Sequence, residues 1–206
     1  EAGARGRLIF AMDATMIRQP TWDRALAIQS QMFAETGRIG GLDVQLVYFR
    51  GFGECRASPW IADSKDLVRR MTGMRCLGGR TQIGRALGHC LAEGKRKKVN
   101  AVVYVGDCME EDIDRLAAQA GELGMLGVPL FVFHEGGDPV ARNAFQQFAR
   151  LSGGAYCAFD AASPDTLRRL LSAVAVYAAG GSAALNRLAA REGGEILRLT
   201  QQMRRR

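Results

Sequence analysis

Apolar and polar residues are arranged along the chain in two patterns that predict its strands and helices. Short unbroken apolar runs are typical of strands buried on both faces, and apolar residues at three- and four-residue steps are typical of amphipathic helices. The runs, with one alternating stretch at 54–57, predict strands at residues 8–12, 42–49, 54–57, 99–105, 128–133 and 155–159. The stepped pattern predicts helices at residues 20–36, 63–71, 81–95, 110–123, 139–151 and 164–177.

The order of these elements predicts an α/β fold. Strands that alternate with helices form a doubly wound, mostly parallel sheet with right-handed crossovers and helices on both faces. The stretch Arg50–Gly53 reads as a tight connection, so residues 54–57 return antiparallel as an edge strand. We therefore expect a six-stranded sheet with one antiparallel edge strand.

The 206 residues suit one sizeable domain, with short segments at its two ends. Residues 1–6 read as a flexible lead-in and residues 7–178 as the domain. Residues 179–206 read as a glycine hinge followed by a basic tail that can be helical, interrupted at Gly193 and Gly194. This tail has three open interpretations: it docks on the domain, it binds a partner helix, or it is a solvated end.

Charge and cysteine content narrow the class of protein. Six arginines against two glutamates from Ser182 onward give +4 of the net +7, so the domain is only mildly basic and nucleic acid is not an expected partner. Five cysteines without a CxxC pair argue against a disulfide framework and a sequence-local zinc site, and favour reduced thiols in the cytoplasm. No apolar run reaches the roughly 18 residues of a membrane span.

Four oxygen-bearing side chains follow strand ends and are predicted to meet at one edge of the sheet. Asp13 and Thr15 follow the first strand, Asp107 follows the strand 99–105, and Thr81 begins the helix after Gly78-Gly79. An oxygen-only ligand set suits Mg²⁺ or Mn²⁺, and a cation offsets the repulsion between two carboxylates. The alternative is that Asp13 and Thr15 only cap the next turn or helix.

These residues resemble the von Willebrand factor A domain. Its metal-ion-dependent adhesion site is written Asp-x-Ser-x-Ser after the first strand, a Thr in a second loop and an Asp after the fourth strand. Asp13-Ala14-Thr15-Met16-Ile17 matches the first motif at two of three positions, Gly78–Leu87 resembles the second, and Val103–Asp107 matches the third. The resemblance covers residues 7–178 and implies a bacterial-type domain. It implies a metal held by Asp13, Thr15, Thr81 and Asp107, and a protein partner whose acidic side chain completes the coordination.

Ile17 departs from this motif, because the family has a second metal-binding hydroxyl at that position. Losing one polar contact weakens the binding of the ion by about 1–3 kcal/mol, although a water can take the vacant coordination position. The resemblance therefore implies a degenerate adhesion site. Two readings remain open: a functional cation site, or a metal-free scaffold that uses its loops or tail.

Further residues near the predicted site are candidates for partner contacts, namely Met16, Ile17, Arg80, Cys108, Glu110 and His134. Two of them, Glu110 and His134, have another interpretation. Glu110, with Glu111 and Asp112, favours a helix N-terminus through the helix dipole. His134 reads more simply as an exposed loop histidine. No base stands at nucleophile spacing from Cys108, so a thiol enzyme is not predicted.

The predicted function is a non-enzymatic protein-interaction module. A Mg²⁺-dependent phosphatase or hydrolase that uses Asp13 and Asp107 is a remote alternative. It lacks a readable general acid and a phosphate-binding lysine beside the site.

Overall fold

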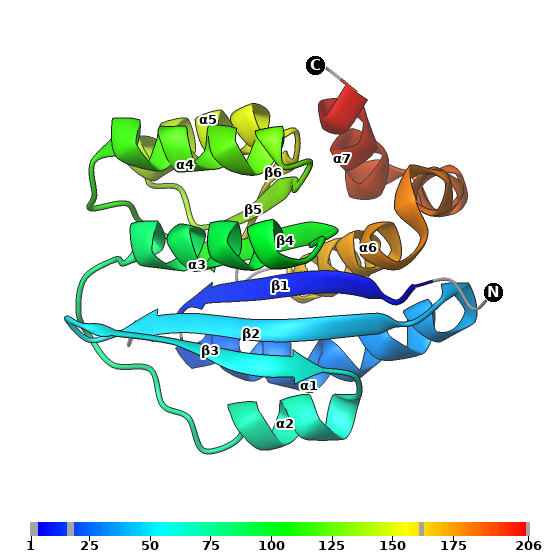
Figure 1. Ribbon diagram of the computed structural model, residues 1–206, viewed down its shortest axis with the longest axis horizontal. Coiled ribbons are helices and arrows are strands. Elements are labelled where there is room, and N and C mark those ends of the chain that lie inside the picture. The colour runs from blue at the N-terminus through cyan, green and yellow to red at the C-terminus, as the bar shows by residue number, and fades with distance from the viewer. Residues whose placement is uncertain (1–3, 16–18, 161–162, 205–206) are drawn as a thin grey trace.

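The computed structural model describes residues 4–15, 19–160 and 163–204, and within them the chain forms a three-layer α/β fold (Figure 1). The sheet order is β3-β2-β1-β4-β5-β6, with all neighbours parallel except β2 and β3. The described strands are β1 (Gly6–Asp13), β2 (Leu42–Arg50), β3 (Glu54–Ile61), β4 (Ala101–Gly106), β5 (Leu130–Glu135) and β6 (Ala155–Phe159). The predicted fold class, including the antiparallel edge strand, is confirmed.

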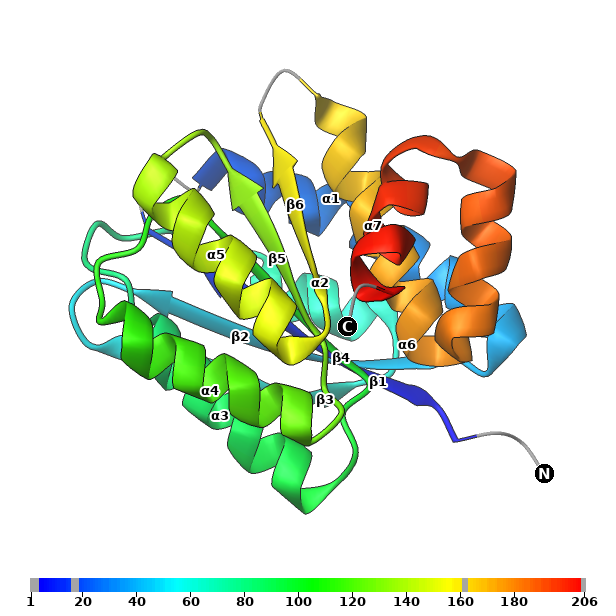
Figure 2. The same ribbon diagram turned by 90° about the horizontal axis from the view of Figure 1, so that it is seen from above.

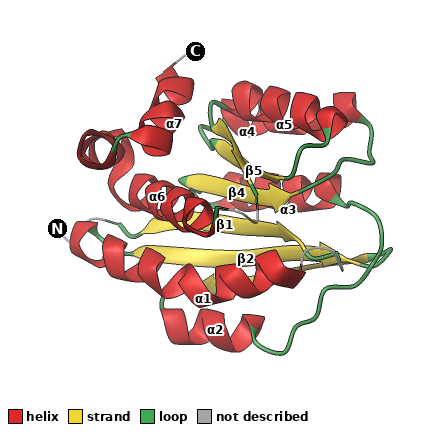
Figure 3. Cartoon of the chain, turned by 180° about the vertical axis from the view of Figure 1, so that it is seen from behind, coloured by secondary structure: helices red, strands yellow, loops and turns green. Residues whose placement is uncertain are grey.

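Helices cover both faces of the sheet. α3, α4 and α5 lie on one face, and α1, α2 and α6 on the other, as the view from behind shows (Figure 3). The described helices are α1 (Gln19–Thr36), α2 (Ser64–Met71), α3 (Ile83–Arg96), α4 (Ile113–Met125), α5 (Pro139–Ser152), α6 (Pro164–Glu192) and α7 (Gly194–Arg204), with a 3-10 turn at Gly37–Ile39. None of the described helices carries an apolar stretch long enough to cross a bilayer.

Strand β1 shows why unbroken apolar runs predict this sheet. All of its residues are buried, and its side chains alternate between the two faces. Leu8 and Phe10 pack in the core beneath α1 and α6, whereas Ile9 and Ala11 pack in the core beneath α3 and α4. A central strand with a helix layer on each side has no solvent face, so it needs no polar alternation.

The N-terminal end of β1 holds a buried arginine whose charge is matched within the chain. Arg7 is 8% exposed, and its Nη1 donates hydrogen bonds of 3.0 and 2.9 Å to the carbonyl oxygens of Lys97 and Lys98. Its Nη2 lies 3.7 Å from Glu93 Oε2, and the guanidinium stands 3.9 Å from the centre of the Trp60 ring. Burial lowers the pKa of Arg7, and Glu93 opposes that shift. A carboxylate, two carbonyls and an indole together compensate this charge.

The tail folds onto the sheet layer. Helix α6 bends at Gly181, whose φ of 71° and ψ of −167° belong to a region that is open mainly to glycine, and α7 begins after Gly193. Buried apolar side chains on both sides of the bend join the core, namely Leu185, Leu188, Ile196 and Leu199. Of the three interpretations of the tail, docking on the domain is therefore the one that the described residues adopt, and the solvated end is wrong.

Helix α7 also covers the outer edge of the sheet (Figure 2). The side-chain amide of Gln202 accepts a hydrogen bond from the backbone N–H of Tyr156 and donates one to its carbonyl oxygen, both 2.8 Å long. Tyr156 lies in β6, the edge strand of the parallel side. The glutamine thus occupies backbone groups that a neighbouring strand would otherwise use.

Candidate functional site

Asp13 and Asp107 meet where β1 and β4 end side by side (Figure 3). Asp13 is the last residue of β1, and Asp107 follows Gly106, the last residue of β4. One carboxylate oxygen of each and the Cys108 sulfur lie within 4.8 Å of one another. Asp13 is 1% exposed, while Asp107 and Cys108 are half-buried. The structure therefore brings together the two predicted carboxylates and one of the predicted contact residues.

The backbone after Asp13 is fixed by short hydrogen bonds. The Thr15 N–H donates to Asp13 Oδ1 at 2.9 Å, which closes a local turn. The Ala14 N–H donates to the Phe49 carbonyl at 2.9 Å, and the Ala14 carbonyl accepts from the Leu77 N–H at 3.0 Å. Thr15 is thus held beside Asp13 through its backbone. Two predicted residues of this motif, Met16 and Ile17, lie outside the described residues.

Thr81 is joined to the cluster through Glu110. The Thr81 N–H donates to Glu110 Oε1, and the Glu110 N–H donates to Thr81 Oγ1, both at 3.2 Å. The Cys108 thiol donates to the same Glu110 oxygen at 3.8 Å. Thr81 is 5% exposed, and it lies in the loop just before α3. Sequence reasoning proposed Glu110 as a contact residue but did not anticipate that it links Thr81 to Cys108.

Acidic residues after Cys108 anchor two different helices. Glu111 accepts hydrogen bonds from the Ile83 and Gly84 N–H groups, at 2.7 and 2.9 Å, at the start of α3. Asp112 is the N-cap of α4, since it accepts from the Asp114 and Arg115 N–H groups. The helix-N-terminus interpretation is correct for this stretch, but Glu111 stabilises α3 rather than the helix that follows it. Helix α4 consequently begins at Ile113, later than predicted.

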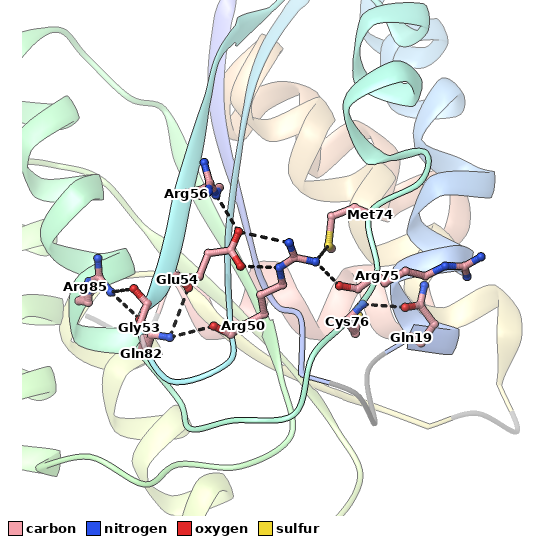
Figure 4. A network of polar contacts seen from close by, with 10 residues as sticks. All are labelled: Gln19, Arg50, Gly53, Glu54, Arg56, Met74, Arg75, Cys76, Gln82 and Arg85. Atoms are coloured by element: carbon pink, nitrogen blue, oxygen red, sulfur yellow. Dashed lines mark hydrogen bonds and ion pairs between the residues drawn. The ribbon is translucent and has the colours of Figure 1, made fainter.

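A polar network around Arg50 holds the loop 72–82 that carries Thr81 (Figure 4). The Arg50 guanidinium pairs with Glu54, with Nε 2.6 Å from Oε2, and also donates to the Arg75 carbonyl. The hydrogen bond to Arg50, followed by one to Arg56, lowers the pKa of Glu54, and the same Glu54 pair raises the pKa of Arg50. The Gln82 amide donates to the Arg50 carbonyl at 3.3 Å. The β2–β3 hairpin therefore positions the second loop.

Gly79 lets this loop approach the hairpin. A Cβ atom at position 79 would lie 1.8 Å from the Gly51 carbonyl oxygen, a distance that no side chain permits. The N–H of the next residue, Arg80, donates to the same oxygen at 3.1 Å. The Arg80 side chain is exposed. Gly79 thus serves backbone packing, whereas a Cβ atom at Gly78 would meet nothing within 4 Å.

His134 is not an exposed loop residue, and that prediction is wrong. Strand β5 extends to Glu135, so His134 lies within the strand and is fully buried. Its Nε2 is 3.3 Å from the Asp107 carbonyl oxygen, and its Nδ1 is 2.7 Å from the Tyr156 hydroxyl. A carbonyl oxygen only accepts, so Nε2 carries the proton and Nδ1 accepts from the phenol. Burial lowers the pKa of His134, so the neutral ring supports the backbone of Asp107.

The electrostatics of the cluster favour a cation. Burial, together with the Asp107, Asp13 and Glu110 carboxylates, raises the pKa of Cys108 to about 12. Burial and then the charges of Asp13, Cys108, Glu111 and Asp107 raise the pKa of Tyr104 as well. The carboxylate contribution to each shift is a negative field, which attracts a cation, whereas the contribution of burial disfavours charge of either sign. Two carboxylates with a thiol beside them form a donor set that fits a divalent cation.

Tyr104 is the member of the site that sequence reasoning missed. The side chain is 2% exposed, and its hydroxyl has no hydrogen-bond partner among the described residues. A Cβ atom at Gly106 would lie 2.4 Å from that hydroxyl, so the phenol ends directly beside the backbone that precedes Asp107. The available signal was a phenol and a glycine within an otherwise aliphatic strand.

Several solved structures with a similar fold are von Willebrand factor A domains. Proximal thread matrix protein 1 from the mussel byssus aligns with a TM-score of 0.65 and 17% identity over 84% of this chain and 48% of that chain. A von Willebrand factor type A protein from Catenulispora acidiphila gives 0.64 and 15%, over 84% and 43% of the two chains. The SpRpn10 VWA domain gives 0.62 and 14%, over 87% and 98%.

The chain thus spans about half the length of the first two of these proteins. Another structure of the mussel protein, with a TM-score of 0.62, is described as having a zinc-occupied MIDAS motif, the metal-ion-dependent adhesion site. No protein-family model matches the sequence, and no curated protein matches it. At these identities the likeness concerns the fold. The chain has the fold of a von Willebrand factor A domain.

Proposed function

We propose that this chain is a non-enzymatic module that binds a protein partner through its rim. The rim is the surface formed by Asp13–Thr15, Thr81 and Asp107–Glu110. A divalent cation held there would bridge to an acidic side chain of the partner. The observation that carries this proposal is the convergence of the Asp13 and Asp107 carboxylates within 4.8 Å at neighbouring strand ends. Open α/β sheets place their ligands at this position.

The cation would be held by residues of three chain segments. Asp13, Asp107 and the hydroxyls of Thr15 and Thr81 are the proposed oxygen ligands, and an oxygen-only set would favour Mg²⁺ or Mn²⁺. The Thr81 hydroxyl accepts from the Glu110 N–H and keeps a second lone pair. The bound cation would supply the positive charge that a partner's carboxylate completes. The zinc-occupied motif of the mussel protein supports a cation at this place in the fold.

Exposed apolar residues beside the rim would add contact area. Phe52, at the tip of the β2–β3 hairpin, is 80% exposed, and Leu77, in the loop before Thr81, is 44% exposed. The Gly51 N–H donates to the Leu77 carbonyl at 3.2 Å, which keeps the hairpin and this loop together. Exposed apolar side chains next to a polar site are typical of interaction surfaces. A partner is therefore expected to carry an acidic residue flanked by apolar ones.

Selection from a displayed random-peptide library, in the presence of Mg²⁺, Mn²⁺ or Zn²⁺, tests the proposal without a known partner. We expect the selected peptides to be enriched in Asp or Glu and to be released by EDTA. Asp107→Asn should abolish their binding, because it removes a proposed cation ligand. Asp114→Asn, which removes an exposed carboxylate in the first turn of α4, is the matched control and should bind normally.

The alternative function is a metal-free scaffold. It predicts peptides that bind equally well with EDTA and to Asp107→Asn, through loops away from the rim. That result would overturn the cation-dependent proposal.

We also infer a reducing compartment such as the cytoplasm. All five cysteines are free thiols, and two of them, Cys55 and Cys108, are only half-buried. Such thiols persist most readily where glutathione and thioredoxin keep them reduced.

A further inference from the structure

The ligand set at the rim includes a sulfur atom. The Cys108 Sγ lies within 4.8 Å of carboxylate oxygens of both Asp13 and Asp107. Mg²⁺ binds oxygen ligands and avoids thiolates, whereas Zn²⁺ and similar soft cations bind them. The oxygen-only set that predicts Mg²⁺ or Mn²⁺ therefore does not describe this cluster completely.

A second and independent observation is the Tyr104 hydroxyl, which is directed at the same place. It is buried and has no hydrogen-bond partner among the described residues, although it lies beside the Gly106 backbone and near enough to Asp13 and Asp107 for their charges to raise its pKa. A buried hydroxyl without a partner is costly and needs an explanation. A cation between the two aspartates, or a water bound to that cation, would satisfy it.

We propose that the rim binds a thiophilic divalent cation of the Zn²⁺ class, with Cys108 as a ligand beside Asp13 and Asp107. This rests on the proposed function for the location of the cation, and it changes the cation's chemical class. As the metal–sulfur bond forms, the S–H bond breaks and its proton passes to solvent, so the cation is bound by two carboxylates and one thiolate. Three protein ligands leave a fourth position open on Zn²⁺. A partner's carboxylate or a water can occupy that position.

Cation titration of the full chain tests the proposal, using Zn²⁺, Co²⁺ and Mg²⁺ separately. We expect one Zn²⁺ per chain, bound more tightly than Mg²⁺, and a Co²⁺ complex with a thiolate-to-cobalt charge-transfer band in the near ultraviolet. Cys108→Ser should abolish that band and weaken Zn²⁺ binding by at least about tenfold, while Mg²⁺ binding does not weaken. Cys55→Ser is the matched control, because Cys55 is also half-buried and free but lies outside the cluster.

Tyr104→Phe provides a readout that does not depend on a folded cysteine variant. It removes the buried hydroxyl and nothing else, so the variant should have a higher Tm than wild type in EDTA. Added Zn²⁺ should raise the Tm of wild type more than that of the variant. A Tyr104→Phe protein with a lower Tm in EDTA would contradict the role given to this hydroxyl.

The outcomes separate this inference from the proposed function. A charge-transfer band that persists in Cys108→Ser, or Mg²⁺ bound more tightly than Zn²⁺ by wild type, overturns the inference. If EDTA still releases the acidic peptides but Cys108→Ser binds Zn²⁺ as tightly as wild type, the proposed function stands while the inference fails. If Zn²⁺ binds through Cys108 but EDTA does not release the peptides, the inference stands and the proposal of cation-dependent partner binding fails.

Discussion

The two ends of strand β1 both bury charge, but they do so in different ways. At the N-terminal end, Arg7 faces Glu93, two carbonyl oxygens and the Trp60 ring, so opposite charges and dipoles meet. At the C-terminal end, Asp13 lies beside Asp107 and the Cys108 thiol, so two carboxylates and a neutral thiol converge. The fold itself explains a buried charge that faces an opposite charge, whereas the two neighbouring carboxylates lie where we propose a cation. The same strand thus has a structural end and, at its C-terminus, the end for which we propose a function.

Removing the charge partner of Arg7, at the structural end of β1, should have the largest effect on stability. Glu93→Gln keeps the shape of the side chain but leaves the buried Arg7 without its carboxylate. We expect the free energy of unfolding, measured by urea denaturation, to fall by about 3 kcal/mol. Glu122→Gln is the control: its pair with Lys95 is exposed, so the change should stay within about 0.5 kcal/mol. A loss below about 1 kcal/mol in Glu93→Gln would show that the carbonyls and the indole alone suffice.

A smaller effect is expected at Arg50, which lies near the C-terminal end of β1 but is matched by Glu54. Arg50→Lys loses the bidentate ion pair with Glu54 and should lower the free energy of unfolding by about 1 kcal/mol at neutral pH. The folded pKa of Glu54 lies below its ordinary value of 4.5, so the pair stabilises above that value. As the pH falls through the folded pKa, the difference between wild type and Arg50→Lys should shrink.

Urea denaturation at neutral pH and in acid measures this dependence. Arg69→Lys, whose partner Asp66 belongs to an exposed pair on α2, should leave stability nearly unchanged at both pH values. A difference for Arg50→Lys that stays constant into acid would show that Arg50 acts through the carbonyls of the loop rather than through Glu54.

The smallest effect on stability is expected from Asp107→Asn, in the cluster of Asp13, Asp107 and Cys108. This substitution sharpens the contrast between the two ends of β1. The substitution removes one of two like charges within 4.8 Å. In EDTA the free energy of unfolding should therefore stay within about 1 kcal/mol of wild type, or rise. Zn²⁺ should stabilise wild type but not the variant, as thermal unfolding with and without the metal would show. A loss comparable to that of Glu93→Gln would place Asp107 among the structural charges.

Elements with strong local signals could be predicted from the sequence. The β1 and β4 runs are buried on both faces, and α5 lies between Pro139 and Gly153, which start and end helices for local reasons. The start of α4 could not be predicted as well, because Glu110 and Glu111 bond to Thr81 and to α3 instead of joining their own helix. Such contacts join residues far apart in sequence and leave no local periodicity.

The candidate site was predictable only where strand ends fix it. Asp13 and Asp107 follow buried parallel strands, and their meeting follows from topology. The prediction for His134 was wrong because β5 extends beyond the apolar residues that predicted it. The buried histidine forms hydrogen bonds with the Tyr156 hydroxyl and the Asp107 carbonyl, which belong to other segments. Tyr104 was missed because its signal, a phenol and a glycine in an apolar run, is weak and also typical of a core strand. Side-chain environment, unlike position in the sheet, is set by non-local packing.

Through Gln202, helix α7 protects the β6 edge of the sheet against aggregation. The other edge strand, β3, carries the charged side chains Glu54 and Arg56, which discourage pairing with another sheet. β6 has instead a glutamine that imitates one residue of a neighbouring strand. A chain shortened before α7 would keep its sheet but open this edge, next to newly bared apolar side chains of the core. After proteolytic loss of α7, we expect β6 to pair with the edge strand of another copy.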